Sequence, residues 1–140
     1  MNDFRMVKLE PGRAPEVIVI EDSFEALIAL TGGGIEIIEP FDDPVALVGN
    51  GLAMLLAMQP NFVLLSSRTG EVSDIVCGIQ FLCGIGEDEL ESLSPEMAEK
   101  YVRIFRNADT FTLFSLELPV IPSDRGGCFN DRSSAVDSPF

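Results

Sequence analysis

The carboxylates are the residues whose types and spacing come closest to a reactive or metal-binding site. They form two pairs and one run: Asp42, Asp43, Glu71, Asp74, Glu87, Asp88, Glu89 and Glu91. Carboxylate oxygens are the usual ligands of magnesium and calcium, so a metal-dependent phosphohydrolase is the enzyme class that these groups could serve. The run from Glu87 to Glu91 lacks the alternating ligands and the turn glycine of a calcium loop. We therefore interpret it as a solvent-exposed acidic turn.

Other reactive groups are scarce. Histidine, the commonest general base, is absent from the 140 residues. The serines have no base nearby in sequence and no surrounding glycine elbow, and they include Ser66, Ser67 and Ser92. The cysteines Cys77, Cys83 and Cys128 are odd in number and have no histidine with which to complete a usual zinc site. We expect reduced structural thiols, no metal, no cofactor and no enzymatic activity.

Acidic residues are concentrated in one part of the chain. The formal net charge is −14, and the span from Ala14 to Glu99 holds sixteen of the 23 acidic residues against a single base, Arg68. Such a field repels phosphate, which disfavours direct binding of nucleic acid or of an anionic membrane. Acidic surfaces also serve ordinary solubility. A positively charged protein groove is the partner that this field attracts.

The N-terminal residues are expected to form a β-hairpin. The apolar-rich runs 5–10 and 16–21 flank a proline- and glycine-containing turn at 11–15. Residues 17–20 are β-branched throughout, which favours a strand with both faces covered. Residues 1–5 are expected to be a frayed extension.

A helix is expected next, from Phe24 to Thr31. Asp22 or Ser23 is placed to cap it, and the three glycines 32–34 end it. These glycines close a helix and precede a strand, which is the reverse of a phosphate-binding loop. Short strands are then expected at 35–39, 45–48 and 62–65.

The apolar run from Ile75 to Ile85, interrupted only by Gln80, is expected to be a central strand buried on both faces. On an unbulged strand, Cys77 and Cys83 would point to the same face roughly 20 Å apart, too far for a disulfide. A helix is expected from Pro95 to Arg106. Ser94 is its N-cap, and its apolar stripe consists of Met97, Ala98, Tyr101, Ile104 and Phe105.

The remaining segments complete an α+β domain. The segment from Leu52 to Met58 is rich in good helix formers and is expected to form one or two helical turns packed on the core. Thr110 to Leu118 is expected to be an added edge strand, closed by two prolines and available for homo-oligomerisation. We expect a single domain over 1–118, with a small mixed or antiparallel sheet in the order ββαββ…β and a packed C-terminal helix. Residues 119–140 are expected to be a mobile tail.

This order of strands and turns resembles an uncharacterised family of domains of unknown function encoded by phages, plasmids and conjugative elements. The resemblance covers about residues 6–106. Its residues are Glu10-Pro11-Gly12, Pro15-Glu16-Val17, Gly33 to Ile38, Pro60-Asn61, Val76 to Gly84, Leu93-Ser94, Glu96 and Tyr101. The resemblance implies a fold and a genomic context, and it carries no catalytic signature.

Binding is therefore the expected function. A carboxylate array can imitate a phosphate backbone, and the mobile-element context implies an antagonist of a host defence protein, of the anti-restriction or anti-CRISPR type. The partner-binding residues expected on the acidic surface are Glu87, Asp88, Glu89, Glu91, Asp42 and Asp43. One alternative is an oligomeric module that sequesters a signalling nucleotide at Arg68, Lys100, Arg103 and Arg106. Another is a phage structural or assembly protein that pairs through residues 110–118.

Location follows from what the sequence lacks. No stretch approaches the roughly 18 consecutive apolar residues of a membrane span. The first residues include Asp3, Arg5 and Lys8, which are unlike the apolar core of a signal peptide. We expect the protein in the cytoplasm of the host cell, without a membrane partner.

Overall fold

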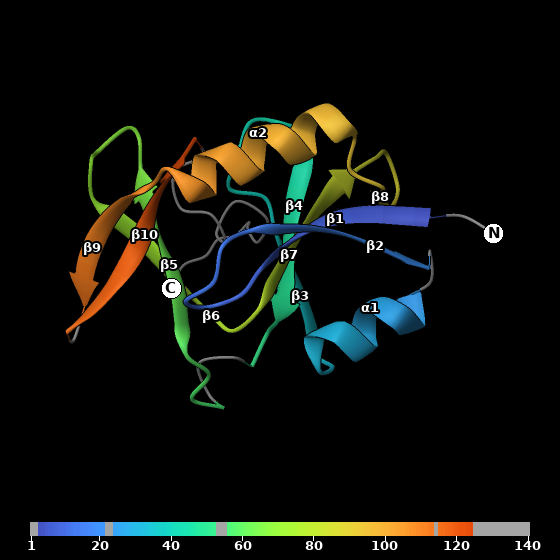
Figure 1. Ribbon diagram of the computed structural model, residues 1–140, viewed down its shortest axis with the longest axis horizontal. Coiled ribbons are helices and arrows are strands. Elements are labelled where there is room, and N and C mark those ends of the chain that lie inside the picture. Colours follow the sequence, from blue (N-terminus) through green and yellow to red (C-terminus); the bar gives the residue numbers. More distant parts are fainter. Residues whose placement is uncertain (1–2, 22–23, 53–55, 114, 125–140) are drawn as a thin grey trace.

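The computed structural model describes residues 3–21, 24–52, 56–113 and 115–124. Within them the chain forms an α+β fold of two β-sheets and two helices (Figure 1). The helices are α1 (Phe24–Thr31) and α2 (Pro95–Arg106). The strands are β1 (Asp3–Leu9), β2 (Glu16–Glu21), β3 (Ile35–Ile38), β4 (Val45–Asn50), β5 (Pro60–Ser66), β6 (Val72–Cys77), β7 (Gln80–Ile85), β8 (Leu90–Glu91), β9 (Asp109–Leu113) and β10 (Leu116–Ser123). The expected α+β class and the expected order of the first five elements are confirmed.

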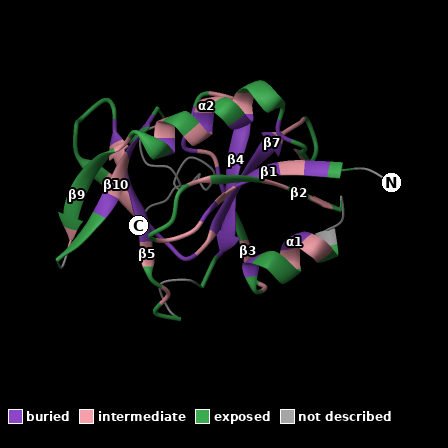
Figure 2. Ribbon diagram, in the orientation of Figure 1, coloured by how far each residue is buried: buried purple, intermediate pink, exposed green. Residues whose placement is uncertain are grey.

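The larger sheet is built around β7. Its strands lie in the order β2-β1-β7-β4-β3, all antiparallel, and β8 pairs with the end of β7. Every residue of β4 is buried, as are the first five residues of β7, and both strands are purple in Figure 2. Strands covered on both faces read as continuous apolar runs, which explains these two sequences.

The smaller sheet has the order β6-β5-β10-β9 and mixes strand directions. The β10 strand runs parallel to β5, while the other two pairs are antiparallel. The β9–β10 hairpin stands at the side of the molecule away from α1 (Figure 1).

Two apolar clusters hold these layers together. The first joins the two sheets and α2, through residues such as Leu47, Phe62, Leu82, Tyr101, Phe105 and Ile121. The second lies on the opposite face of the larger sheet, where α1 contributes Leu27. Because successive side chains of a strand point to opposite faces, Met6 joins the second cluster and its neighbour Val7 joins the first. The larger sheet is thus buried on both faces along its centre.

Both helices begin or end where their local signals indicated. The Ser94 hydroxyl accepts a hydrogen bond from the Met97 backbone N–H at 3.1 Å, which caps α2, and Pro95 is the first helical residue. At the end of α1, Gly32 has a φ of 85°, and its N–H donates to the Ile28 carbonyl at 3.0 Å. This is the expected glycine C-cap. The expected N-cap of α1, Asp22 or Ser23, lies outside the described residues.

The expectation of one strand across residues 75–85 is wrong. The run divides at Gly78 into β6 of the smaller sheet and β7 of the larger one. Gly78 has a φ of 78°, and its carbonyl accepts a hydrogen bond at 2.9 Å from the side-chain amide of Asn61. The same amide nitrogen donates to the Leu9 carbonyl at 2.7 Å. A left-handed glycine and a buried amide therefore turn the chain from one sheet into the other.

Two expectations about the N-terminal hairpin are also wrong. Its β2 strand is an edge strand, in which no residue is fully buried, because the sheet ends beside it. The β1 strand begins at Asp3, opposite Glu21, so residues 3–5 belong to the sheet rather than to a frayed extension. Pairing with residues 19–21 of β2 holds them there.

The segment after β4 is not packed on the core in its described part. Leu52 and Leu56 are 51% and 56% exposed, and one hydrogen bond of 2.8 Å, from Leu56 N–H to Leu52 carbonyl, spans the turn. Ala57 follows with a φ of 58°, which ends any helical course. Residues 53–55 lie outside the described residues.

The expected single edge strand at 110–118 is a hairpin of β9 and β10. Its second strand runs through Pro119 and Pro122, which were expected to end it, because parallel pairing with β5 continues as far as Ser123. Ile121 is fully buried, and the Ser123 hydroxyl donates to the Pro40 carbonyl at 3.0 Å. The ordered strand therefore extends beyond the expected domain end at Leu118, whereas residues 125–140 of the expected tail lie outside the described residues. Neither helix in the described part of the chain is long and apolar enough to cross a membrane.

Candidate partner-binding site

The acidic run forms the tight turn between β7 and β8. The Gly86 N–H donates to the Glu89 carbonyl at 2.8 Å, which closes the turn and places Glu87 and Asp88 at its tip. The Glu91 side chain folds back over Gly86, so closely that a Cβ at this glycine would collide with its carboxylate. The side chains of all four acids of the run are exposed, as we expected of an acidic turn.

A shallow hollow of about 470 Å³ lies beside this turn. Its apolar lining is Ile37, Ile85 and Leu90, and the acids that line it are Glu39, Glu87, Asp88 and Glu89. None of the described residues lining it is basic. Glu39 comes from the end of β3 and was not among the predicted site residues. The sequence offered no signal that Glu39 would lie at the acidic turn. Only the pairing of β4 with both β3 and β7 brings the end of β3 close to the turn after β7.

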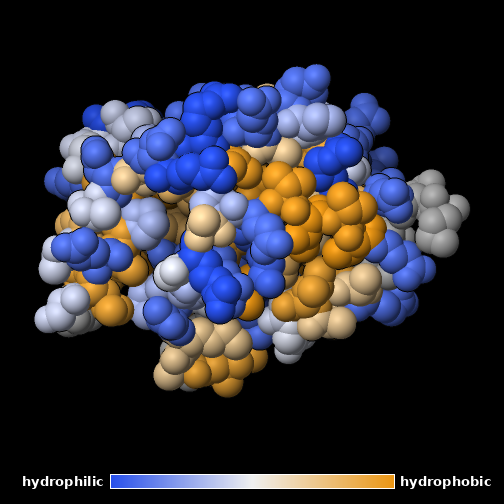
Figure 3. Space-filling model, in the orientation of Figure 1, coloured by the Kyte–Doolittle hydropathy of each residue, from blue (hydrophilic) through white to orange (hydrophobic). Residues whose placement is uncertain are grey.

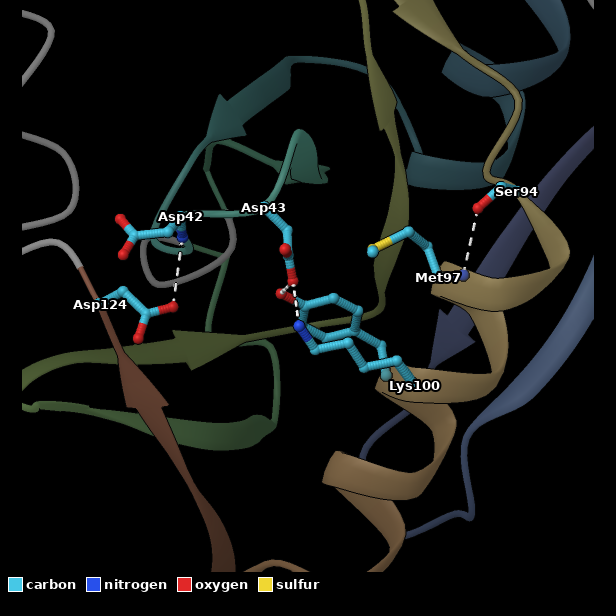
Figure 4. A network of polar contacts seen from close by, with 7 residues as sticks. Asp42, Asp43, Ser94, Met97, Lys100 and Asp124 are labelled. Atoms are coloured by element: carbon cyan, nitrogen blue, oxygen red, sulfur yellow. Dashed lines mark hydrogen bonds and ion pairs between the residues drawn. The ribbon is translucent and has the colours of Figure 1, made fainter.

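Asp43, by contrast, is taken up in a structural contact with α2 (Figure 4). Its Oδ2 accepts hydrogen bonds from Lys100 Nζ at 2.6 Å and from the Tyr101 hydroxyl at 2.8 Å. The hydrogen bond from Lys100, followed by that from Tyr101, lowers the pKa of Asp43 below its usual range. Burial, together with the Asp43 carboxylate, raises the pKa of Tyr101, so the phenol remains a donor. Asp43 therefore links the β3–β4 loop to α2, and its negative charge is paired with that of Lys100.

Asp42 remains exposed, but it faces a different neighbour. Its backbone N–H donates to Asp124 Oδ2 at 3.2 Å, which joins the β3–β4 loop to the end of β10 (Figure 4). Neither Asp42 nor Asp43 lines the hollow at the acidic turn. Of the six predicted partner-binding residues, the structure thus keeps four together and separates two.

The other candidate reactive groups, the metal-binding carboxylates and the cysteine thiols, do not form a site in the described residues. Among the described residues, no group of three or more cysteine, aspartate or glutamate side chains is arranged to hold a metal ion. Cys77 and Cys83 are free and buried, and Cys128 lies outside the described residues. Burial raises the pKa of Cys83 to about 12, and burial followed by the nearby Asp74 carboxylate raises that of Cys77. Both thiols are therefore poor nucleophiles.

The expected basic nucleotide site is likewise dispersed. Lys100 is paired with Asp43, and Arg103 lies 3.8 Å from a Glu99 carboxylate oxygen. Arg106 instead lines a separate groove with Arg13, while Arg68 lies in the β5–β6 turn. Two of the four cations are thus engaged by carboxylates of this chain.

The fold and site together define a two-sheet α+β protein that presents an acidic turn beside a small, partly apolar hollow. The chain belongs to the DUF3846 family, described as a domain of unknown function, whose match covers residues 4–106. This confirms the expected membership of an uncharacterised domain family and agrees with the expected limits of about 6–106. The β9–β10 hairpin follows the matched region. No curated protein and no solved structure matches the chain.

Proposed function

We propose that this protein binds and inhibits a host defence protein that handles nucleic acid, of the anti-restriction or anti-CRISPR type, and performs no chemistry of its own. The observation that carries the proposal is the acidic hollow, which is lined by both carboxylates and apolar side chains. Its carboxylates are Glu39, Glu87, Asp88 and Glu89, and its apolar residues are Ile37, Ile85 and Leu90.

A lysine or arginine side chain matches both parts of this hollow. Such side chains pack their aliphatic stems against apolar surface and keep the charged head at a polar rim. A groove evolved to hold phosphates presents several of these cations, and a cluster of carboxylates offers them a substitute set of charges. The net charge of −14 would also speed encounter with such a groove and make it sensitive to salt.

The resemblance to a family encoded by phages and other mobile elements supports this role. An element that enters a cell meets nucleases and other defence proteins whose nucleic-acid grooves are basic. A small acidic protein that occupies such a groove would act in the cytoplasm of the host cell. No bound nucleic acid, membrane or cofactor is part of the proposal.

The test is a pull-down from host lysate at several salt concentrations, followed by binding measurements on the recovered protein. Reversing Glu87, Asp88, Glu89 and Glu91 to lysine should slow association by about tenfold or more at low salt and flatten its salt dependence. A matched variant with four scattered exposed reversals controls for net charge. Its positions are Asp3, Glu71, Asp109 and Glu117. Equal effects of the two variants would refute a localised acidic site.

Two other results would replace the proposal. Recovery of no protein, together with a nucleotide bound in native mass spectrometry, would favour the sequestering module. Recovery of neither, together with large closed assemblies, would favour a structural or assembly protein, with the β9–β10 hairpin as its pairing element.

A further inference from the structure

Apart from the two-residue β8, which pairs only with the end of β7, four strands form the edges of the two sheets in the described structure. These four strands differ in how well they are protected. On β3 the exposed Glu36 interrupts the apolar residues, and on β6 Asp74 does so. The register of β6 with β5 also shifts twice along its length. Charges and irregularities of this kind discourage a sheet edge from accepting another strand. The β9 edge is composed largely of alternating threonines and apolar residues in a hairpin beyond the family match.

The four central residues of the β2 edge have none of these protections. Six consecutive residues pair with β1 without a bulge, and the four central ones are Val17, Ile18, Val19 and Ile20. Val17 and Val19 are 45% and 53% exposed, while Ile18 and Ile20 pack against the second apolar cluster. Figure 3 shows that apolar side chains gather over β2 and continue toward α1. No described strand pairs with the outer side of β2.

The backbone of β2 also offers hydrogen-bonding groups at the sheet edge. In an antiparallel pair, the N–H and C=O groups of alternate residues face away from the partner strand. Those of β2 therefore form a row at the sheet edge that a further strand can complete, with side-chain contacts on both faces. With six residues, β2 is as long as a typical strand.

We propose that the β2 edge accepts an extended segment of a partner protein as an additional strand. The segment carries apolar residues at alternate positions and a lysine or arginine near each end. The sign and the positions of the charges on this segment follow from Glu16 and Glu21, which stand at the two ends of β2 and are both exposed. Opposite charges across neighbouring strands stabilise the pairing, whereas like charges destabilise it.

The same two glutamates disfavour a second copy of this chain as the occupant. An antiparallel β2–β2 pair in full register would place Glu16 of one copy opposite Glu21 of the other at both ends. It would also bring together two molecules with a net charge of −14 each. Charge complementarity therefore selects a basic segment. This docking surface is distinct from the acidic hollow and does not depend on it.

The test uses the full chain and a short blocked peptide that alternates valine and threonine between two terminal lysines. Binding is followed by titration calorimetry and by amide hydrogen exchange of β2. We expect slower exchange at the outward-facing amides of β2 on binding. A matched peptide with terminal glutamates should bind at least about tenfold more weakly, because its ends meet Glu16 and Glu21. N-methylation along one edge of the lysine peptide should abolish binding, since it blocks strand pairing.

Two protein variants locate the site. Val19→Lys should weaken binding of the lysine peptide at least about tenfold, because a lysine on an edge strand opposes strand addition. Val72→Lys alters a 41%-exposed valine on the β6 edge and should leave binding unchanged. Circular dichroism establishes that both variants fold. The fourfold lysine variant of the acidic turn should keep the preference for the lysine peptide over the glutamate peptide, because Glu16 and Glu21 are unchanged, so this proposal and the proposed function can fail separately.

Several results would overturn the proposal. Equal binding of the lysine and glutamate peptides would show that Glu16 and Glu21 do not select the charge of the bound segment. Binding of the N-methylated peptide would show that the peptide does not bind by strand pairing. Slow exchange at the outward-facing β2 amides without peptide would show that the edge is already covered. Sedimentation of that sample would then assign the cover to a second copy if the chain is dimeric, and to another part of the same chain if it is monomeric.

Discussion

Removal of the Phe105 ring should be among the most costly single changes in this protein. Phe105 lies in the last turn of α2, is 7% exposed and belongs to the cluster that joins the helix to both sheets. Its ring centroid lies 5.1 Å from that of Phe62 on β5, at an interplanar angle of 80°. This edge-to-face contact fastens α2 to the smaller sheet.

The expected cost of Phe105→Ala is about 3–4 kcal/mol of unfolding free energy. Truncation of a buried phenylalanine costs about 3–5 kcal/mol, and a site at the end of a helix can relax into part of the cavity. The matched control on the same helix is Arg103→Ala. The Arg103 side chain is 62% exposed and its ion pair with Glu99 is long, so its loss should cost less than about 0.5 kcal/mol.

Urea unfolding followed by far-ultraviolet circular dichroism measures both variants, since the chain has no tryptophan. Similar losses in the two variants would refute the packing face assigned to α2. A double-mutant cycle of Phe62→Leu and Phe105→Leu isolates the contact between the rings, with an expected coupling of about 0.5–1.5 kcal/mol. Zero coupling would refute that contact while leaving the burial argument intact.

Three further predictions concern the acid response, the thiols and the strand break. Asp43→Asn should cost about 1 kcal/mol at pH 7, because the hydrogen bonds from Lys100 and Tyr101 favour the carboxylate and lower its pKa in the folded state. That stability is present above the unfolded pKa of about 4 and is lost as the pH falls through the lower folded pKa. Urea titrations at neutral and acid pH should therefore converge for parent and variant, and a constant gap would contradict this assignment. Cys83 should react with a thiol reagent at pH 8 only after unfolding, as burial raises its pKa to about 12, and rapid labelling of the native protein would disprove its burial. Gly78→Ala should cost about 1–2 kcal/mol in urea unfolding, because φ is 78° there, and no loss would mean that the turn is not left-handed.

The order of elements was predictable from the sequence wherever the signal was local. The cap formed by Ser94 and Pro95, the glycines after α1 and the turn of the N-terminal hairpin all act within a few residues. Their chemistry fixes a backbone conformation with little help from the rest of the fold. Both helices, the first hairpin and the α+β class were therefore predictable from the sequence.

The candidate site was predictable only in part. The exposure of the acidic turn followed from its charge density, since unpaired carboxylates are rarely buried. Asp43 is not part of the exposed acidic surface, because it pairs with Lys100, which is 57 residues away in the sequence. This contact requires α2 to lie against the β3–β4 loop. Glu39 lines the hollow only because of the order of the strands in the larger sheet. Neither contact has a local signal.

The tertiary structure alone decided which apolar runs are central and which are edges. The β2 and β7 segments are both rich in apolar residues, yet β7 lies in the middle of the larger sheet and β2 at its edge. Only long-range pairing distinguishes them, because composition measures how apolar a strand is and not how many neighbours it has. For the same reason, Gly78 could be identified as a special position but not as the point where the chain changes sheets. The sequence by itself determined the locally signalled elements and the sign of the net charge, whereas tertiary pairing determined where the apolar run divides, which strands lie at a sheet edge and which carboxylates stay exposed.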